Sequence, residues 1–330
     1  MSKIPIYELE ADEDFEIFRN SNKRATTLGR LPLTIPIDES TDMTGKVCMI
    51  TGSTAGIGKV TALELAKLGA TVIIVARSRQ RGRPALRFVQ EGSGSEKIEL
   101  MYADLSSIAS IRNLVENFRK KHSRLDVLIN NAAVVPKERE LSLDGYEMQF
   151  AVNHLAPFCL TNLMLDVLKA TEGARIINVS SEAHNRARLD FDNLQSEKKY
   201  SPFSAYGMSK LENIYFTYAL ARRLVGTGVT VNALHPGVIR SELIRQMPIW
   251  YEWIFNWFAK PTVDGSEGTV YLASSPQAAG VSGKYFSGKL ETKSSPASYD
   301  EAAGERLWEL SERLCDIESL NGTSSKTPTP

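Results

Sequence analysis

Short hydrophobic runs alternate with longer segments of helical pattern through the middle of the chain. The runs are rich in Val and Ile and are hydrophobic without interruption, which is typical of strands covered on both faces. Repeated strand–helix alternation predicts an α/β fold with a single doubly wound parallel sheet, flanked by helices on both faces. We expect strands at 47–51, 71–75, 98–102, 127–130, 175–179, 229–233 and 284–286, and helices at 59–68, 108–121, 145–169, 204–225 and 264–273.

The same pattern predicts how the chain divides. A boundary inside 45–290 would cut the strand–helix alternation, so we predict one domain over 45–317. Residues 1–44 have an acidic patch followed by basic residues and prolines, which indicates an N-terminal arm that is partly irregular. Residues 318–330 are polar and rich in turn formers, and we predict that this tail is disordered.

Composition excludes several classes of protein. The 330 residues are 42% hydrophobic and 24% charged, as in ordinary globular proteins, and a formal net charge of zero argues against a nucleic-acid binder. Three distant cysteines give neither a disulfide framework nor a zinc site, and four scattered histidines predict no metal centre. No hydrophobic run reaches about 18 residues and no signal peptide is visible, so we expect no transmembrane span and cytoplasmic residence.

A glycine-rich stretch, TGSTAGIG at 51–58, lies between the first expected strand and the first expected helix. Its glycines would permit a tight turn and let the backbone approach a pyrophosphate, which the helix N-terminus would face. The spacing G-x-x-x-G-x-G differs from the usual G-x-G-x-x-G, so the glycines alone leave an ordinary turn open. With the strand–turn–helix order, they predict a Rossmann-type dinucleotide site that includes Gly52, Ser53, Thr54, Gly56, Ile57 and Gly58.

The end of the second expected strand favours one cofactor over another. An NAD site would favour an acidic residue here, but no Asp or Glu occurs between residues 71 and 90. Arg77 stands at this point instead, followed by Ser78, and a guanidinium suits a 2′-phosphate because it binds phosphate with two hydrogen bonds. Lys59 could add a second charge. A solvated basic loop is the alternative, but the pattern predicts NADP(H) in preference to NAD(H).

Tyr206 and Lys210 are candidates for acid–base chemistry. They are four residues apart in an expected helix, so they lie on one helix face. An ammonium near the phenol would lower the tyrosine pKa from its ordinary value of about 10 and make it a usable acid or base. A Tyr-x-x-x-Lys pair also arises by chance on surfaces, but here a Ser-Ser pair, Ser180 and Ser181, ends an intervening strand.

Taken together, these stretches resemble the short-chain dehydrogenase/reductase family over about residues 45–290. The matching residues occur in the family's order: TGSTAGIG at 51–58, Asp104-Leu105, NNAA at 130–133, Asn153, NVSS at 178–181, Tyr206 with Lys210, and HPG at 235–237. Longer stretches at 150–158, 192–224, 235–243 and 304–314 are similar to the retinol-dehydrogenase-like branch.

The resemblance implies roles for four catalytic residues. Tyr206 would give or take the proton at the substrate oxygen, and Lys210 would lower its pKa and hold the nicotinamide ribose. Ser181, rather than Ser180, would hydrogen-bond the substrate oxygen. Asn153 would hold a water that links Lys210 to solvent.

The resemblance also implies further cofactor contacts. Asp104 would contact the adenine and Asn130 the adenosine ribose side, and the backbone after Pro236 would face the nicotinamide. The remaining cofactor-binding residues implied in this way are Leu105, Asn131, Ala132, Gly237 and Val238, together with Tyr206 and Lys210 themselves.

The implied reaction is the NADP(H)-linked interconversion of an apolar alcohol and its aldehyde or ketone, such as a retinoid, polyprenoid, steroid or other lipidic carbonyl. One alternative is a non-catalytic protein that senses the redox state of NADP(H), but such a sensor needs only the cofactor half of the site. A second is an epimerase or dehydratase of nucleotide sugars. Those relatives usually show a G-x-x-G-x-x-G turn and a longer C-terminal domain, which this chain does not.

An aromatic segment bears on the substrate. Six aromatic residues stand between Trp250 and Phe258, within residues 238–262, where the family builds its substrate lid. A helix would place Trp250, Trp253 and Trp257 on one apolar face. That face could cover a lipidic substrate, touch a membrane surface, pack against a second copy in a homo-oligomer, or belong to the core.

Overall fold

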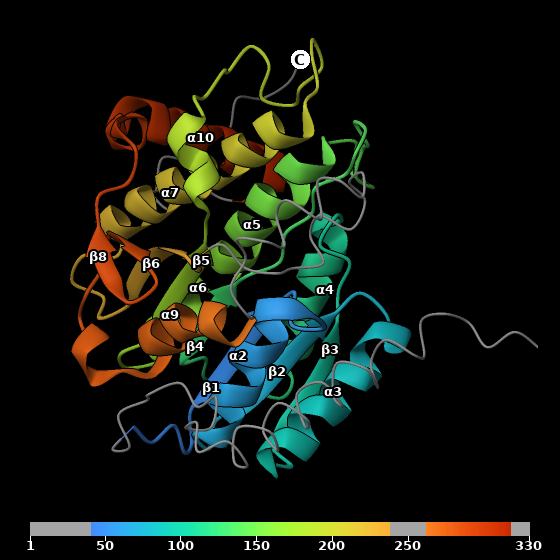
Figure 1. The fold of residues 1–330 in the computed structure, drawn as a ribbon, viewed down its shortest axis with the longest axis vertical. Coiled ribbons are helices and arrows are strands. Elements are labelled where there is room, and N and C mark those ends of the chain that lie inside the picture. Colours follow the sequence, from blue (N-terminus) through green and yellow to red (C-terminus); the bar gives the residue numbers. More distant parts are fainter. Residues whose placement is uncertain (1–40, 238–261, 318–330) are drawn as a thin grey trace, which may run out of the picture.

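The computed structural model describes residues 41–237 and 262–317, and these form one eight-stranded α/β structure (Figure 1). The strands are β1 (Val47–Thr51), β2 (Thr71–Ala76), β3 (Ile98–Tyr102), β4 (Val127–Asn130), β5 (Arg175–Val179), β6 (Thr230–His235), β7 (Lys284–Ser287) and β8 (Leu290–Thr292). The α-helices are α2 (Gly56–Lys67), α3 (Arg79–Ser93), α4 (Ile108–Arg119), α5 (Ala156–Leu163), α6 (Leu165–Ala170), α7 (Pro202–Arg223), α9 (Thr262–Ser274) and α10 (Glu301–Cys315). Short helical segments of other types are η1 (Phe150–Leu155, π), η2 (Glu182–Arg186), η4 (Pro276–Ala278) and η5 (Pro296–Tyr299, 3-10 like η2 and η4).

The sheet has the order β3-β2-β1-β4-β5-β6-β7-β8 and crosses the whole molecule in Figure 1. All neighbouring strands are parallel except β7 and β8, which pair antiparallel. The chain order reverses direction between β1 and β4, which places a crevice at the carboxyl ends of these strands. The predicted doubly wound parallel sheet is therefore confirmed.

Helices cover both faces of the sheet, as the uninterrupted hydrophobic strands predict. On β1 and β2, Met49 and Ile73 face one core, which also contains Phe118 of α4, Phe158 of α5 and Phe216 of α7. The alternate residues of the same strands face a second core against α2, α3 and α9. Each strand therefore buries both of its faces, which is why strand and helix patterns are both strong in the sequence.

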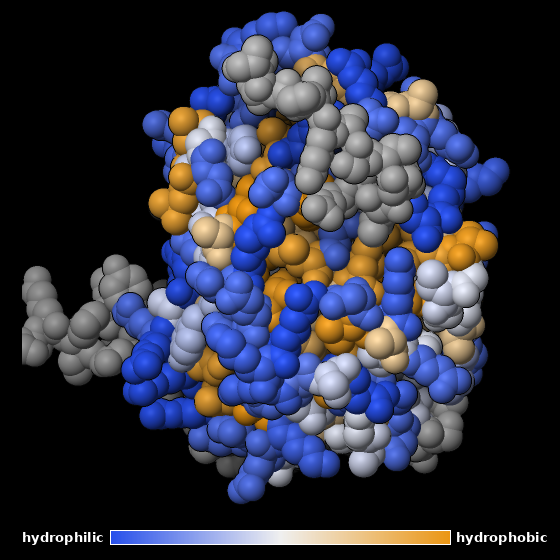
Figure 2. Space-filling model, turned by 180° about the vertical axis from the view of Figure 1, so that it is seen from behind, coloured by the Kyte–Doolittle hydropathy of each residue, from blue (hydrophilic) through white to orange (hydrophobic). Residues whose placement is uncertain are grey.

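The surface is mostly polar, and the large hydrophobic side chains that stand out from it, such as Leu143, Val225 and Leu290, come from separate loops and strand ends. Figure 2 shows, on the face opposite to that of Figure 1, hydrophobic residues that gather towards the centre within a polar surround. In the described part of the chain, no helix is both long and apolar enough to cross a membrane.

Three elements are missing from the sequence prediction, and one predicted helix is divided in the structure. Helix α3 was not expected, because Gly82 and Pro84 interrupt its pattern, yet Ser78 caps its first turn by accepting the Arg81 N–H. Helix α10 and strand β8 were also not among the expected elements. The single helix expected over 145–169 is instead the π-segment η1 followed by α5 and α6, with a break at Met164.

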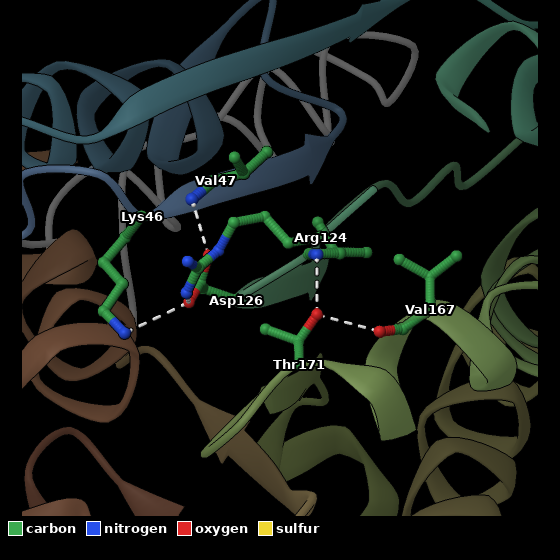
Figure 3. A network of polar contacts seen from close by, with 7 residues as sticks. Lys46, Val47, Arg124, Asp126, Val167 and Thr171 are labelled. Carbon is green, nitrogen blue, oxygen red and sulfur yellow. Dashed lines mark hydrogen bonds and ion pairs between the residues drawn. The ribbon is translucent and has the colours of Figure 1, made fainter. Parts of the chain in front are cut away.

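A buried carboxylate joins the amino ends of β1 and β4, at the edge opposite to the crevice (Figure 3). Asp126 accepts hydrogen bonds from the Val47 N–H at 2.9 Å and from the Arg124 guanidinium at 2.6 and 2.8 Å, and Lys46 lies 3.2 Å away. Burial by itself raises the pKa of Asp126, but these partners outweigh burial and the pKa lies below its usual range. The network fixes the two strands whose other ends carry the site.

Candidate active site

The carboxyl ends of β1, β4, β5 and β6 meet at one edge, because these strands are parallel neighbours. This edge brings together the glycine turn after β1, Asn131 after β4, Ser181 after β5 and Pro236 after β6. Helix α7, which carries Tyr206 and Lys210, packs against β5 and β6. Residues that are up to about 180 positions apart in the sequence therefore belong to one site.

The glycines of the turn have distinct structural reasons. Gly52 has φ +64°, and a Cβ there would lie 2.7 Å from the Cα of Ala132. A Cβ at Gly58 would lie 2.5 Å from the Asn131 side-chain nitrogen and from the Gly52 carbonyl oxygen. Gly56 has φ +54° but open space where a Cβ would be. Gly52 and Gly58 thus allow close packing, whereas Gly56 allows a left-handed backbone beside an open surface.

Asn131 holds this turn in place. Its side-chain amide donates to the carbonyls of Thr51 at 2.9 Å and Gly52 at 3.1 Å, and its N–H donates to the Thr51 hydroxyl at 3.0 Å. The sequence predicts that Asn131 and Ala132 contact the cofactor but does not indicate this structural role of Asn131. The pairing of β1 with β4 is the signal that could have revealed it, because it sets the residue after Asn130 beside the turn.

The start of α2 fits an anionic group. Its N-cap residue, Ala55, provides no side-chain hydrogen bond, so backbone N–H groups of the first turn are left for another acceptor. The Ser53 side chain is turned inward and donates to the Ile50 carbonyl at 2.7 Å, which leaves its backbone for any cofactor contact. Thr54 and Ile57 are half-buried beside it.

The basic residues expected at the 2′-phosphate divide into two groups. Arg77 is exposed, and no hydrogen bond or ion pair to another described residue is present at its side chain. Lys59 is buried with its ammonium 4.5 Å from the centre of the Phe88 ring, so its predicted contribution is not supported. Ser78 is used as the α3 cap. Asp104, expected at the adenine, accepts from the N–H and hydroxyl of Ser106 and so orders the turn before α4.

Ser181 and Tyr206 are joined by a side-chain hydrogen bond. Burial raises the pKa of Tyr206 to about 12, and the hydrogen bond with Ser181 offsets only part of that effect. Lys210 was expected to lower this pKa, and that expectation is wrong for the structure as it stands. The Lys210 ammonium donates to the Val179 carbonyl at 2.9 Å and lies 5.5 Å from the centre of the Tyr206 ring.

The pKa of Lys210 is also strongly shifted. Its side chain is 1% exposed, and burial lowers its pKa to about 7. The buried Ser180 hydroxyl donates to the Lys210 carbonyl at 2.8 Å and thereby joins the end of β5 to α7. Ser180 is thus used in packing, while Ser181 is half-buried and next to Tyr206.

Asn153 lies in the π-helical segment η1, a type of distortion that is frequent at functional sites. Its side chain is fully buried: Oδ1 accepts from the Val134 N–H at 2.8 Å, and Nδ2 donates to the Val134 carbonyl at 3.0 Å and the Ser209 hydroxyl at 3.1 Å. The side chain therefore holds the segment after β4 against α7. The implied role of Asn153 as the holder of a water stays a prediction.

Asn130 does not have the role expected for it. Its side chain is 2% exposed and donates to Thr161 Oγ1 at 3.0 Å and to Asn178 Oδ1 at 2.8 Å. Asn178 in turn donates to Thr217 Oγ1 at 3.0 Å. The chain of buried side chains ties β4 and β5 to α5 and α7, so the Asn130 side chain supports the sheet beneath the site rather than reaching a ribose.

Of the remaining cofactor and lid predictions, only some concern residues that the structure describes. Pro236 and Gly237 are half-buried at the end of β6, and Gly237 has φ +94° with open space beside its Cα. Leu105 is half-buried before α4. Several predicted segments lie outside the described residues. They are Val238, the predicted lid at 238–262 except for its last residue, the aromatic segment, the N-terminal arm up to residue 40 and the tail at 318–330.

A doubly wound sheet with a glycine turn after β1, with Ser181 directly after β5 and with Tyr206 and Lys210 on α7, is the arrangement of a dinucleotide-dependent oxidoreductase. Residues 46–252 match the family described as short chain dehydrogenase. The chain belongs to the short-chain dehydrogenase family, and its similarities place it among the retinol-dehydrogenase-like members.

Two human relatives illustrate that similarity. Retinol dehydrogenase 14 of Homo sapiens is 43% identical over 294 residues, covering 83% of this chain and 88% of the relative. Retinol dehydrogenase 13 of Homo sapiens is 42% identical over 284 residues, covering 83% and 86%. Among solved structures, an uncharacterised protein from Mycobacterium paratuberculosis has a TM-score of 0.69 and 31% identity, covering 85% of this chain and 97% of that chain.

The burial of Lys210 generates a pH-dependent prediction. Its folded pKa of about 7 lies below the ordinary 10.5, so between these values the unfolded chain binds more protons. Burial therefore costs most stability below pH 7, and the cost is relieved as the pH rises towards 10.5. We expect Lys210→Met to be more stable than wild type at pH 6, by about 2–4 kcal/mol, and the difference to shrink by pH 10.

Urea unfolding at pH 6, 8 and 10 measures this difference, and Lys120→Met, a change at an exposed position, is the control. A stability difference between wild type and Lys210→Met that is the same at pH 6 and pH 10 would contradict the prediction.

Proposed function

We propose that this protein is an NADP(H)-dependent oxidoreductase that interconverts an apolar alcohol and its aldehyde or ketone. The observation that carries the proposal is the contact of Ser181 with Tyr206, next to the buried Lys210, at the sheet edge that also holds the glycine turn. A site that only bound a nucleotide would need the glycine turn and not the other three residues. The membership of the family supports the same class of reaction.

The residues present fit a dinucleotide. Gly56 leaves open space beside an uncapped helix start, which suits the pyrophosphate, and the unpaired Arg77 suits a 2′-phosphate. Pro236 and Gly237 would lie on the nicotinamide side. When bound, NADP(H) supplies or accepts the hydride. The protein supplies the orientation and the proton.

Tyr206 would handle the proton at the substrate oxygen. With its pKa raised to about 12 by burial, its phenol is neutral near pH 7 and can donate to the oxygen of a carbonyl that is being reduced. In the opposite direction Tyr206 would first have to lose its own proton, and its phenolate oxygen would then accept the proton of the alcohol. Ser181 would donate a second hydrogen bond to the substrate oxygen, where negative charge develops. Lys210 would hold the ribose hydroxyls from behind Tyr206.

The class of substrate is inferred from the relatives. Both human relatives carry the name retinol dehydrogenase, and retinol is an apolar alcohol. We infer a retinoid, polyprenoid, steroid or other lipidic carbonyl, converted in the cytoplasm or at a membrane surface. A non-catalytic sensor of NADP(H) is not favoured, because the Ser181, Tyr206 and Lys210 set has no purpose in that function.

Cofactor preference generates the next prediction. NADPH should bind more tightly than NADH, because Arg77 can bind the 2′-phosphate with charge-assisted hydrogen bonds. Arg77→Ala should weaken NADPH binding by about 10- to 100-fold and leave NADH binding nearly unchanged. Calorimetric titration measures the affinity for each cofactor. The control is Arg83→Ala, which removes an exposed arginine of α3. Equal affinities of the wild type for the two cofactors would refute the assignment.

The role of Tyr206 generates another prediction. Tyr206→Phe keeps the ring packing and removes the proton, so kcat for reduction of an apolar aldehyde should fall by about 10²–10⁴-fold while NADPH affinity is unchanged. Steady-state kinetics and a fluorescence titration of NADPH measure the two effects. Tyr271→Phe on α9 should behave as wild type. If Tyr206→Phe kept nearly the wild-type kcat, another group would have to transfer the proton.

A further inference from the structure

A buried histidine next to Ser181 has no role in the mechanism described so far. His184 lies in η2, three residues after Ser181, and its side chain is fully buried. Its Nδ1 is 2.6 Å from the Ser181 carbonyl oxygen, and its Nε2 accepts the Ser295 N–H at 3.0 Å. The ring therefore bridges the serine that faces the substrate and a segment that is more than 100 residues further along the chain.

The geometry defines the protonation state of this ring. A backbone N–H can only donate, so the Nε2 that faces Ser295 must be the nitrogen without a proton. The single proton of the neutral ring is then on Nδ1, which donates to the Ser181 carbonyl. The Ser181 carbonyl also accepts the His184 N–H at 3.1 Å, so residue 184 binds it through both ring and backbone.

The bridge continues to the helix that carries Tyr206. The Ser295 carbonyl accepts the Ser298 hydroxyl at 2.6 Å, and Ser298 is hydrogen-bonded to Ser294 at 2.6 Å. Ser294 is hydrogen-bonded to the Tyr218 hydroxyl at 2.7 Å, and Tyr218 belongs to α7. All three serines are buried. Ser181 and Tyr206 are therefore connected by their own contact and by a second path through His184.

Packing also confines η2 from two sides. A Cβ at Gly207, the residue after Tyr206, would lie 2.9 Å from the Ala183 carbonyl oxygen, so α7 touches the backbone of η2. On the other side, the His184 ring lies 4.9 Å from the Tyr285 ring of β7.

We propose that His184 is a positioning residue for Ser181, whose neutral ring holds the Ser181 carbonyl and the Ser295 N–H together and releases the Ser295 N–H when it is protonated. The inference rests on the proposed function, in which Ser181 binds the substrate oxygen. A protonated ring presents N–H groups on both sides, so its Nε2 would face the Ser295 N–H donor to donor. The Nδ1–H would still donate to the Ser181 carbonyl, but the ring would no longer tie Ser181 to Ser295, and Ser181 would lose its fixed orientation towards Tyr206.

The charged and titratable groups around the ring set the pH range of this effect. Burial lowers the pKa of His184, and the bond to Ser181 and the charge of Glu182 offset burial only in part. Glu182 is also 3.6 Å from His235 on β6, whose pKa is lowered by burial too, and Tyr285 and Tyr218 face the ring and its network from β7 and α7. The folded pKa lies below 6.5, so the neutral form persists at pH 7 and activity should be lost as the pH falls below 6.5.

Two amide substitutions separate the two arms of the bridge. In His184→Asn, the amide nitrogen takes the place of Nδ1 and can still donate to Ser181, but it does not titrate. In His184→Gln, the amide oxygen takes the place of Nε2 and can accept from Ser295, but the Ser181 arm is lost. We expect His184→Gln and His184→Ala to lower kcat at pH 7 by about tenfold or more, with NADPH affinity unchanged. His184→Asn keeps only the Ser181 arm, as the protonated ring does, so it should also lower kcat at pH 7 and should lack the decline below pH 6.5.

The kinetic test is the pH profile of kcat for retinal reduction by the full chain, with thermal unfolding of each variant recorded alongside. His122→Asn, at a histidine near Glu99 beyond α4, is the matched control and should retain the decline below pH 6.5. The proposal is overturned if His184→Asn keeps the wild-type kcat at pH 7, or if the acid decline persists in His184→Asn.

A second measurement does not depend on activity. Nitrogen NMR of the histidine-labelled protein at pH 7 should show one ring with its proton on Nδ1 whose signals disappear in His184→Asn. The proposal is overturned, whatever the kinetics, if the signals that disappear in His184→Asn come from a ring that is protonated on Nε2 or on both nitrogens. If wild type binds NADPH but turns over no carbonyl, the proposed function fails, and the NMR result still decides whether His184 makes the bridge.

Discussion

The burial of one ammonium is the constraint around which this site is built. Lys210 is 1% exposed, and its nitrogen donates to the carbonyl of the last residue of β5. Water would solvate that charge far better than a single carbonyl does, which is why burial lowers the pKa of Lys210 to about 7. The surrounding structure must therefore hold α7 against β5 firmly enough to keep the lysine in place.

Several buried polar groups supply that hold. Ser180 binds the backbone of Lys210 itself, and the side chains of Asn130 and Asn178 connect β4 and β5 to α5 and α7. Asn153 joins the segment after β4 to Ser209 on the same helix. The side chains of Asn130, Asn153 and Asn178 are buried, so breaking one of their bonds would leave an unsatisfied polar group. These bonds fix the positions of Ser181 and Tyr206 relative to each other. In a similar way, Asn131 fixes the glycine turn.

The sequence predicted the parts whose signal is local and failed where side-chain direction decides. Strands β1 to β5 were found almost to the residue, because both of their faces are buried and their hydrophobic runs are continuous. Helix α3 was missed because its hydrophobic pattern is broken by Gly82 and Pro84, and the π-segment at η1 was taken as a regular helix. The motif residues were located correctly, but Lys59 and Asn130 point into the protein, and no pattern of residue types reveals that. The prediction that the pKa of Tyr206 is lowered was wrong for the same reason. The sequence showed the neighbouring charge of Lys210 but not the burial that outweighs it.

The most direct measurement follows the hydride itself. NADPH that carries two deuterium atoms at the nicotinamide C4 is incubated with the protein and with retinal, a polyprenal, a steroid ketone or an aliphatic aldehyde, and the products are analysed by mass spectrometry. The account predicts that at least one long apolar carbonyl is converted to an alcohol that contains one deuterium on the former carbonyl carbon. A protein that binds NADPH tightly but gives no deuterated alcohol from any of these carbonyls would contradict it and favour a non-catalytic NADP(H)-binding protein.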